Sequence, residues 1–505
     1  MSTAELLQLS VILLSSAFLC IIGLMRTLFG DIPIALWQAS SLHDFTTRLL
    51  KLNNGTLLLS GPMFLNGDMI ITSDPMNAHH VLSRNFTNYE KGRDFKAIMD
   101  AYGDGIINSD GESWKLKRQL VHSLINTKEF EDHVMKVMAV KLEHTLFRVL
   151  DDCASSSEVV DIQDVLKRFM FDNICLLVLG FDPGYLRPAG LLLSTTTPTL
   201  LCGKAFDDLK EAVVYRHIVP KFLWRIQKRL DVGVEKKASR SRQILDDFIY
   251  ARIETRKQEL VKLGGINDDN NANDVLTRLL VTGQDKSDKF VRDTVFSLIG
   301  AGRDLISSAL TWFLWLVVTH PTVEGRILHE IKLVMNVRQD DDDQDRLFFT
   351  KDELNKLVYL HAAIWETLRL YPPAPFEHKC AVEADVLPSG HGVPKGTKIL
   401  FSIYSMGRME EIWGEDCTEF KPERWISEKG NVIHVPSYKL MAFLAGPRTC
   451  TGKAIAFLQL KSMASAILWN YKFDIVEGHV MKPTPAMILL MKDGLKMRVS
   501  KRGLV

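Results

Sequence analysis

Hydrophobic residues recur with a helical period through most of the chain, and β-like runs occur only near its two ends. Residues 56–74 contain two such runs around Asn66-Gly67, a dipeptide that favours a tight hairpin turn. Asp74-Pro75 then supplies the N-cap and first-turn residues of a helix. A second hairpin is predicted around Gly494, within residues 487–499. The pattern predicts a mainly α protein with small β-sheets (α+β), without a cut point between two autonomous domains.

One predicted helix is unusually long, because residues 287–320 contain no proline and Pro321 follows them. Some thirty helical residues would span about 50 Å, and the second half of this segment is apolar on nearly every side, as in a buried helix. Gly300 and Gly302 interrupt it, although glycine costs about 1 kcal/mol relative to alanine inside a helix. Two explanations are open for these glycines: close packing against another helix, or a local groove beside Asp304. A dinucleotide-binding fingerprint does not explain them, since a third glycine and a preceding strand are absent.

An uncharged apolar run of twenty residues lies between Glu5 and Arg26. A helix of that length rises about 30 Å, the thickness of the hydrocarbon core of a bilayer. A cleaved signal peptide would show a basic start and a small-residue cleavage site, and both are missing. The sequence therefore predicts a membrane anchor over residues 1–26 and one further domain over residues 27–505. Arg26 weakly favours a cytosolic position for that domain.

Composition excludes several classes of protein. With 46% hydrophobic residues, 24% charged residues and a net charge of +1, the chain is globular and lacks the basic excess of a nucleic-acid-binding protein. Its seven cysteines are scattered without a CxxC pair, which indicates reduced thiols in a cytosolic compartment. Residues 267–274 and 339–345 are polar loops. The second lacks the ligand spacing of a calcium loop, so a solvated connection is predicted.

The segment FLAGPRTCTGK, residues 443–453, places Cys450 among turn-forming residues just before a predicted helix. A nearby arginine, Arg448, and the helix start both favour a thiolate. Such a group is a nucleophile, a metal ligand or a free thiol. Nothing pairs Cys450 convincingly with a histidine base, which disfavours a cysteine protease. Motifs of serine hydrolases, zinc proteases and phosphate-binding loops are absent.

Two further groups of residues have spacings that suggest a role. Glu366 and Arg369 are neighbours on one helix face, and such a pair is usually a surface salt bridge worth under about 1 kcal/mol. Apolar neighbours suggest burial here, and Arg424 is a candidate third partner. Trp114 and Arg118 lie one helical turn apart, where an indole and a guanidinium could together hold an anionic group.

Together these residues resemble the cytochrome P450 family of haem-thiolate monooxygenases. Residues 443–452 match the family motif FxxGxRxCxG at every fixed position, and the other motifs follow the family's order. The resemblance covers essentially everything after the predicted anchor. The phrases AGRD, DVLPSGH, SMGRME and WGEDCTEFKPERW are further similar to plant fatty-acid ω-hydroxylases and mid-chain alkane hydroxylases. They look closest to the alkane-hydroxylase family, which also contains enzymes of alkaloid phenol coupling.

The resemblance implies a cytochrome P450 fold behind an N-terminal transmembrane helix, with haem b whose iron takes the Cys450 thiolate as its axial ligand. The residues that it implies around the haem are Trp114, Arg118, His378, Phe443, Arg448 and Cys450. Glu366, Arg369 and Arg424 would form a buried structural triad. Gly302 and Asp304 would act at the dioxygen groove. The substrate pocket would include Ile106, Phe296, Ile299, Leu305, Phe376 and Met487.

The implied reaction is hydroxylation of a long-chain aliphatic substrate with O₂ and electrons from NADPH. The chain shows no flavin or nicotinamide fold, so a separate membrane-bound reductase is expected, with the protein single-pass in the endoplasmic reticulum membrane and its catalytic domain cytosolic. No nucleic-acid partner is expected. Phenol coupling in alkaloid synthesis is one alternative. A haem-binding protein with little monooxygenase activity is another, supported only by Leu305, which stands where the family usually has threonine or serine. The family's proline-rich hinge is also missing, with only Pro33 near it.

Overall fold

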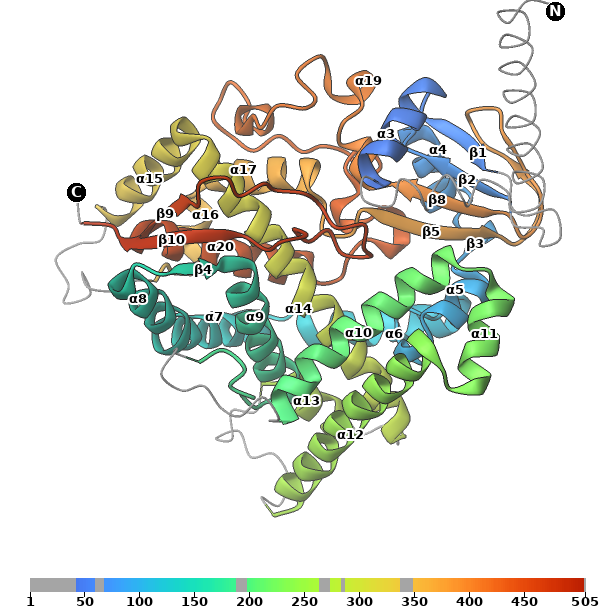
Figure 1. Ribbon diagram of the computed structural model, residues 1–505, viewed down its shortest axis with the longest axis horizontal. Coiled ribbons are helices and arrows are strands. Elements are labelled where there is room, and N and C mark those ends of the chain that lie inside the picture. The colour runs from blue at the N-terminus through green and yellow to red at the C-terminus, as the bar shows by residue number, and fades with distance from the viewer. Residues whose placement is uncertain are drawn as a thin grey trace, which may run out of the picture.

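The computed structural model describes residues 42–59, 68–187, 198–262, 273–282, 287–336 and 348–503 (Figure 1). The predicted anchor, the Asn66-Gly67 turn and the polar loop 339–345 lie outside these residues, as does most of the loop 267–274. Within the described residues the prediction of a mainly helical protein with small sheets is confirmed.

Helices make up most of the molecule. In the first half they are α3 (Leu42–Leu52), α4 (Pro75–His79), α5 (Gly92–Ile98), α6 (Gly111–Ile125), α7 (Lys128–Lys141), α8 (Phe147–Ser156), α9 (Ile162–Leu179), α10 (Pro198–Ile218), α11 (Lys221–Leu230) and α12 (Gly233–Lys262). In the second half they are α13 (Val275–Val281), α14 (Asp288–Thr319), α15 (Pro321–Met335), α16 (Lys351–Lys356), α17 (Val358–Leu370), α18 (Ile403–Met406), α19 (Glu410–Trp413) and α20 (Lys453–Asn470). Short 3-10 turns that bear on the site are η3 (Phe86–Asn88), η4 (Asp100–Tyr102), η7 (Pro422–Trp425), η8 (Met441–Phe443) and η9 (Gly446–Arg448).

The described strands form three small sheets. The five-stranded sheet has the order β1 (Thr56–Leu59), β2 (Met69–Thr72), β8 (Lys398–Ser402), β5 (Phe376–Ala381) and β3 (Tyr89–Glu90). Only its β2–β8 pair is parallel. β4 (Val159–Asp161), β10 (Lys496–Lys501) and β9 (Tyr471–Ile475) form an antiparallel sheet, and β6 (Asp385–Val386) pairs with β7 (Gly392–Val393). The first predicted hairpin is confirmed in its strands, because β1 pairs antiparallel with β2.

The predicted C-terminal hairpin is wrong. Gly494 does lie in a turn, with φ +73°. The strand after it, β10, pairs with β9 and β4, whereas the residues before the turn make only an isolated bridge between Pro483 and Met491. Burial explains the choice, because Met497 and Val499 of β10 are almost fully buried beside β9 and gain an apolar partner there.

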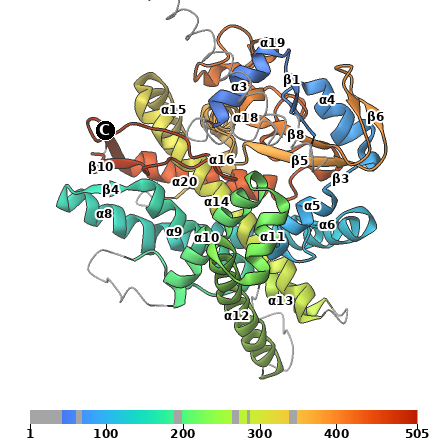
Figure 2. The ribbon, with the colours of Figure 1, turned by 45° about the vertical axis from the view of Figure 1, so that its right-hand side comes forward.

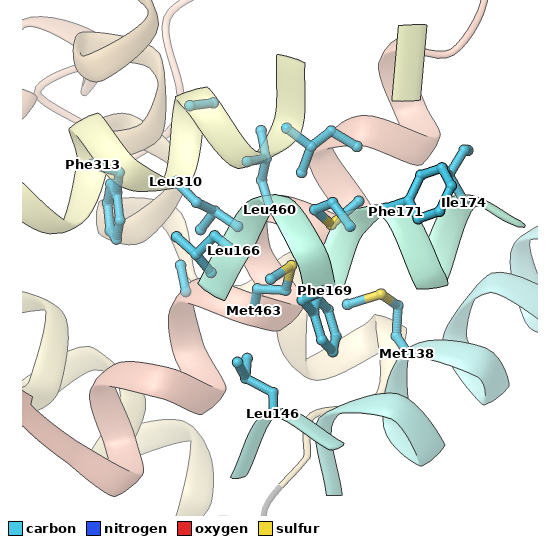
Figure 3. Packing of buried hydrophobic residues seen from close by; sticks show 14 of the residues in the cluster. Met138, Leu146, Leu166, Phe169, Phe171, Ile174, Leu310, Phe313, Leu460 and Met463 are labelled. Atoms are coloured by element: carbon cyan, nitrogen blue, oxygen red, sulfur yellow. The ribbon is translucent and has the colours of Figure 1, made fainter. Parts of the chain in front are cut away.

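The long predicted helix is confirmed as α14. Ser287 caps its start by accepting a hydrogen bond from the Phe290 amide, and Pro321 begins the next helix. Figure 3 shows Leu310 and Phe313 of α14 packed with side chains of α9 and α20 in the main core. Among the described residues, α14 is the one helix long and apolar enough to cross a membrane, but 72% of its most apolar stretch is buried inside the protein. It is therefore the central core helix.

A layer of helices covers the N-terminal half of α14. α10 and α12 pack against each other, α12 also packs against α14, and α11 packs against α12 (Figure 2). Two buried arginines of α14 anchor the layer: Arg292 pairs with Asp246 of α12, and Arg303 lies 3.2 Å from Asp207 of α10. These contacts place α10 beside the glycines of α14.

Candidate active site

The cysteine loop is held in one conformation by its backbone. The Cys450 amide donates a hydrogen bond to the Phe443 carbonyl at 2.8 Å, which closes the loop. The Phe443 ring packs against Phe457 of α20. Gly446 has φ +65°, and a Cβ at this position would lie 1.8 Å from the Leu82 carbonyl oxygen. Glycine satisfies both constraints, so this motif residue fixes the loop against the neighbouring chain.

The thiol of Cys450 does not behave as the sequence suggested. Its side chain remains accessible, yet the surrounding protein atoms raise the pKa of the thiol above its ordinary value by burial. The Gly452 amide, Arg118 and Lys453 favour the thiolate, as expected for a cation and a helix start, but burial outweighs them. In the protein alone, burial therefore outweighs the neighbours that favour a thiolate. A bound metal ion would supply what is missing, because it deprotonates a coordinating thiol.

Trp114, Arg118 and Arg448 come together near this loop. The Arg448 guanidinium lies 4.5 Å from the centre of the Trp114 ring, and that of Arg118 lies 5.8 Å from it. Arg448 donates to the Ser109 carbonyl and pairs with Asp110, both at 2.8 Å. Its Nε, however, is buried without a hydrogen-bond partner among the described residues. The cluster therefore retains a hydrogen-bond donor, Arg448 Nε, that is free to bind a ligand.

Lys379 of β5 is a second spare cation, and the sequence analysis missed it. Its side chain is fully buried, and its Nζ finds no hydrogen-bond partner in the described chain. The amine lies 5.6 Å from the centre of the Phe86 ring, which in turn contacts Trp114. Burial lowers the pKa of Lys379 to about 7, and Arg448 and Asp110 are close enough to affect it. An unpaired buried amine is costly, so its position suits an anionic group that the protein alone does not contain.

His378, the predicted neighbour of that group, precedes Lys379 on β5, and its Nε2 is also buried without a hydrogen-bond partner among the described residues. Its ring meets Phe95 of α5 edge-on at 5.4 Å and His217 of α10 at 6.2 Å. Successive residues of a strand point to opposite faces of the sheet, so His378 and Lys379 face different surroundings. The contacts put Lys379, and not His378, beside Arg448. Burial also lowers the pKa of His378 well below its usual range.

Asp304 lies in a buried charge cluster between α14 and α10. Its carboxylate is 3.1 Å from the Lys210 amine and 3.7 Å from the Arg303 guanidinium. Burial alone would raise the pKa of Asp304, but these two cations hold it below the ordinary value. One carboxylate oxygen, Oδ1, has no hydrogen-bond partner among the described residues. Asp304 is therefore ionised at neutral pH and retains one free acceptor.

The two glycines of α14 serve different contacts. A Cβ on Gly302 would lie 2.4 Å from Cδ1 of Ile174 on α9, so this glycine permits close packing of two helices. A Cβ on Gly300 would lie 2.9 Å from the Tyr102 hydroxyl oxygen, so this glycine receives a phenol. A Cβ on Gly302 would thus point toward α9, whereas one on Gly300 would point toward the cavity described next.

A small cavity lies beside α14, between α10 and the turn η4. Two of the six predicted pocket residues, Phe296 and Met487, line it together with Asp304. The complete lining, called here the α14 cavity, is Ala101, Tyr102, Phe206, Leu209, Lys210, Val213, Phe296, Gly300, Asp304, Met487 and Ile488. The other four predicted residues are not part of it: Ile299 is fully buried in the core, Ile106 and Leu305 are half-buried, and Phe376 packs against His43. Sequence motifs gave no signal for Tyr102 or Lys210.

Glu366, Arg369 and Arg424 meet as the sequence suggested. The first two are fully buried and lie 2.7 Å apart, and Arg424 reaches Glu366 at 3.4 Å. Trp425 donates its indole N–H to the same carboxylate at 2.8 Å. Arg369 also donates to backbone carbonyls, including that of Glu419 at 2.9 Å. The group ties α17 to the segment around η7, behind the cysteine loop.

Two features of this region lack a partner in the protein alone: the Cys450 thiol and the unpaired cationic groups of Arg448 and Lys379. A haem would supply both partners, since its iron binds a thiolate and its two carboxylates bind cations. The residues present fit that group, which defines the class as haem-thiolate proteins. Comparison with known proteins gives the family: residues 62–499 match the model described as cytochrome P450, and the chain belongs to this family. It is a P450 monooxygenase with a haem-thiolate cofactor.

Several curated plant proteins are similar over nearly the whole chain. An alkane hydroxylase of Arabidopsis thaliana is 41% identical, over 93% of this chain and 92% of that protein. Cytochrome P450 86B1 of the same plant is 38% identical, over 94% and 85%. A noroxomaritidine synthase of Narcissus is 37% identical, over 95% and 91%. Relatives with different named activities thus have similar sequence identity to this chain.

Proposed function

We propose that this monooxygenase hydroxylates a long-chain aliphatic substrate. The observation that carries the proposal is the 41% identity to an alkane hydroxylase over 93% of this chain. The α14 cavity, about 20 Å³ in volume, is too small to hold such a substrate, but its mostly apolar lining, which includes Phe206, Val213 and Phe296, is consistent with one. An apolar lining favours a hydrocarbon chain, because burial of each methylene contributes about 0.8 kcal/mol. The relative named as an alkane hydroxylase supports the same class of substrate. Phenol coupling is the second candidate, supported by the noroxomaritidine synthases at similar identity.

In this proposal the Cys450 thiolate would bind the haem iron, and Trp114, Arg118 and Arg448 would hold the haem carboxylates. Lys379 joins them, because its amine is buried, unpaired and lies over Phe86, which contacts Trp114. When bound, the haem supplies the activation of O₂. The protein's residues shield the cavity from water with apolar side chains and bring protons to it past Asp304.

A carbon-monoxide difference spectrum of the reduced protein tests the ligand assignment. Wild type is expected to show the thiolate-type band, and Cys450→Ser is expected to lose it, because an alkoxide is a poor substitute for a soft sulfur donor. Cys153→Ser, at a half-buried cysteine of α8, is the matched control and should keep the band. An unchanged band in Cys450→Ser would exclude Cys450 as the ligand.

Substrate class is tested by supplying alkanes, fatty acids and phenolic alkaloids in parallel to the protein with an NADPH-dependent reductase. Hydroxylated aliphatic product is expected. Product from phenolic substrates alone would establish coupling, and NADPH consumption without any product would indicate a haem protein with little monooxygenase activity. Dependence of turnover on the added reductase tests the expected partner.

Attachment to a membrane is part of the proposal, with residues 1–26 as the anchor. A feature of the described residues supports it: α11 exposes Phe222 and Ile226 to 52% and Leu230 to 65%, and basic residues stand beside them. Such a helix is typical of a surface that lies on anionic lipid. Deleting residues 1–26 is expected to weaken membrane association while leaving the haem spectrum intact. Secretion of the full-length protein would instead identify the segment as a signal peptide.

A further inference from the structure

Tyr102 occupies an unusual place in the α14 cavity. Its ring packs against the backbone of α14 at Gly300, where a Cβ would lie 2.9 Å from the hydroxyl oxygen. The ring also meets Phe296 edge-on at 5.1 Å between centroids. Asp304 is one helical turn beyond Gly300, hence on the same face of α14, and lines the same cavity. The phenol oxygen is thus held between the glycine and the region of the carboxylate.

Monooxygenation has a fixed demand for protons. One oxygen atom of O₂ enters a C–H bond and the other leaves as water, which consumes two electrons and two protons in each cycle. Protons must reach a cavity lined mainly by apolar groups, so a positioned O–H or N–H donor is required. Leu305 beside Asp304 has no such group.

Nearby hydroxyls of α14 are already engaged. Ser308 donates to the Leu489 carbonyl at 2.7 Å, and Ser307 donates to the carbonyls of Arg303 and Asp304 at 3.1 Å. Ser308 lies three residues beyond Leu305 on α14 and offers another hydroxyl, but its hydrogen bond to the Leu489 carbonyl engages its proton. Tyr102, by contrast, lines the cavity, where its hydroxyl can donate.

We propose that the Tyr102 hydroxyl is the proton donor of the α14 cavity and replaces the hydroxyl that α14 lacks at Leu305. This inference rests on the proposed monooxygenase function. The proton that leaves the phenol is replaced by one from solvent that enters past Asp304 and Lys210, so Tyr102 is unchanged after each cycle. Burial and the charge of Asp304 raise the pKa of Tyr102, so the phenol keeps its proton at neutral pH. Asp304 is ionised and buried, and Lys210, whose side chain is 15% exposed, connects it toward solvent.

The test is Tyr102→Phe, which removes one oxygen and keeps the ring against Phe296. Product per NADPH consumed is expected to fall by roughly tenfold, since a positioned proton donor contributes about 10²–10⁴-fold and water replaces it in part. Peroxide should account for the lost product. Tyr185→Phe, at a tyrosine whose ring lies against Gly203 of α10, is the matched control and should leave the ratio unchanged. Adding Leu305→Thr to Tyr102→Phe should restore most of the lost coupling.

A second readout needs no turnover. The infrared carboxylate band that disappears in Asp304→Asn is expected to shift in resting Tyr102→Phe and to stay in place in Tyr185→Phe, because Tyr102, unlike Tyr185, lines the same cavity as Asp304. Haem content and the carbon-monoxide band should be equal in all variants. A wild type without product or without that band would contradict the proposed function itself.

Three results in an active wild type would overturn the inference. One is an unchanged ratio of product to NADPH in Tyr102→Phe. Another is an equal loss in Ser308→Ala, which would return the role to the serine. The third is a rise in KM at constant coupling, which would make Tyr102 a substrate contact only.

Discussion

Removal of the Glu366 carboxylate is expected to destabilise the protein severely. This side chain is fully buried and receives five hydrogen bonds from four residues. Arg369 donates twice at 2.7 Å, the Lys421 amide once at 3.0 Å, Arg424 once at 3.4 Å and the Trp425 indole once at 2.8 Å. Glu366→Ala would leave the Arg369 guanidinium buried with backbone carbonyls as its only acceptors.

The expected magnitude follows from burial. Breaking a buried ion pair by removing one partner costs about 3–5 kcal/mol, because the remaining charge is left uncompensated. Native proteins have only about 5–15 kcal/mol to lose, so Glu366→Ala should lower both yield and haem occupancy. Glu366→Gln retains the shape and one acceptor oxygen and should cost less. The matched control is Glu112→Ala, which removes an i,i+3 partner of Lys115 that is 80% exposed, and which should cost at most about 1 kcal/mol.

Urea unfolding, followed by haem absorbance and by far-ultraviolet circular dichroism, measures the differences. The order of stability should be wild type, Glu112→Ala, Glu366→Gln and Glu366→Ala. The reasoning is refuted if Glu366→Ala unfolds at the same urea concentration as Glu112→Ala with an unchanged slope, since the buried carboxylate would then contribute no more than an exposed one.

Other predictions concern the haem contacts and α14. Lys379→Met should release haem to a scavenging apoprotein several-fold faster than wild type, whereas Lys395→Met, at a lysine that is 68% exposed, should not; equal rates would remove Lys379 from the haem contacts. Gly302→Ala should destabilise the protein by about 1–3 kcal/mol, because its Cβ would meet Ile174. In an Ile174→Ala background the same change should cost clearly less, and a cost that stays the same in urea unfolding would show that the glycine has another purpose.

Local signals in the sequence were sufficient where the structure depends on local rules. The proline-free run from residue 287 and the stop at Pro321 predicted the limits of α14, because a proline acts within one helical turn. The pairing of Glu366 with Arg369 followed from helical spacing, and its burial from apolar neighbours. The turn at Gly494 was also readable, but its strand partner was not, since β10 pairs with strands that the chain brings together only on folding.

The functional residues that escaped sequence reasoning depend on contacts between distant segments. Lys379 differs from its neighbour His378 only by the face of β5 on which it lies, and the Phe86 contact that identifies it spans nearly three hundred residues. Tyr102 and Lys210 belong to no motif. Their possible role can be recognised only in the folded protein, where η4 and α10 bring them into the lining of the α14 cavity.

The glycines of α14 show how two explanations for one motif can both hold. Residues two apart on an α-helix point about 200° away from each other, so Gly300 and Gly302 cannot serve the same neighbour. Gly302 accommodates Ile174 of α9 and so permits close helix packing. Gly300 accommodates the Tyr102 phenol and so leaves a groove that admits a polar group. Each glycine costs about 1 kcal/mol of helix propensity, and each cost is offset on a different face. The packing face fixes the position of α14 in the core, and that fixed position holds Asp304 and the Tyr102 hydroxyl at one cavity.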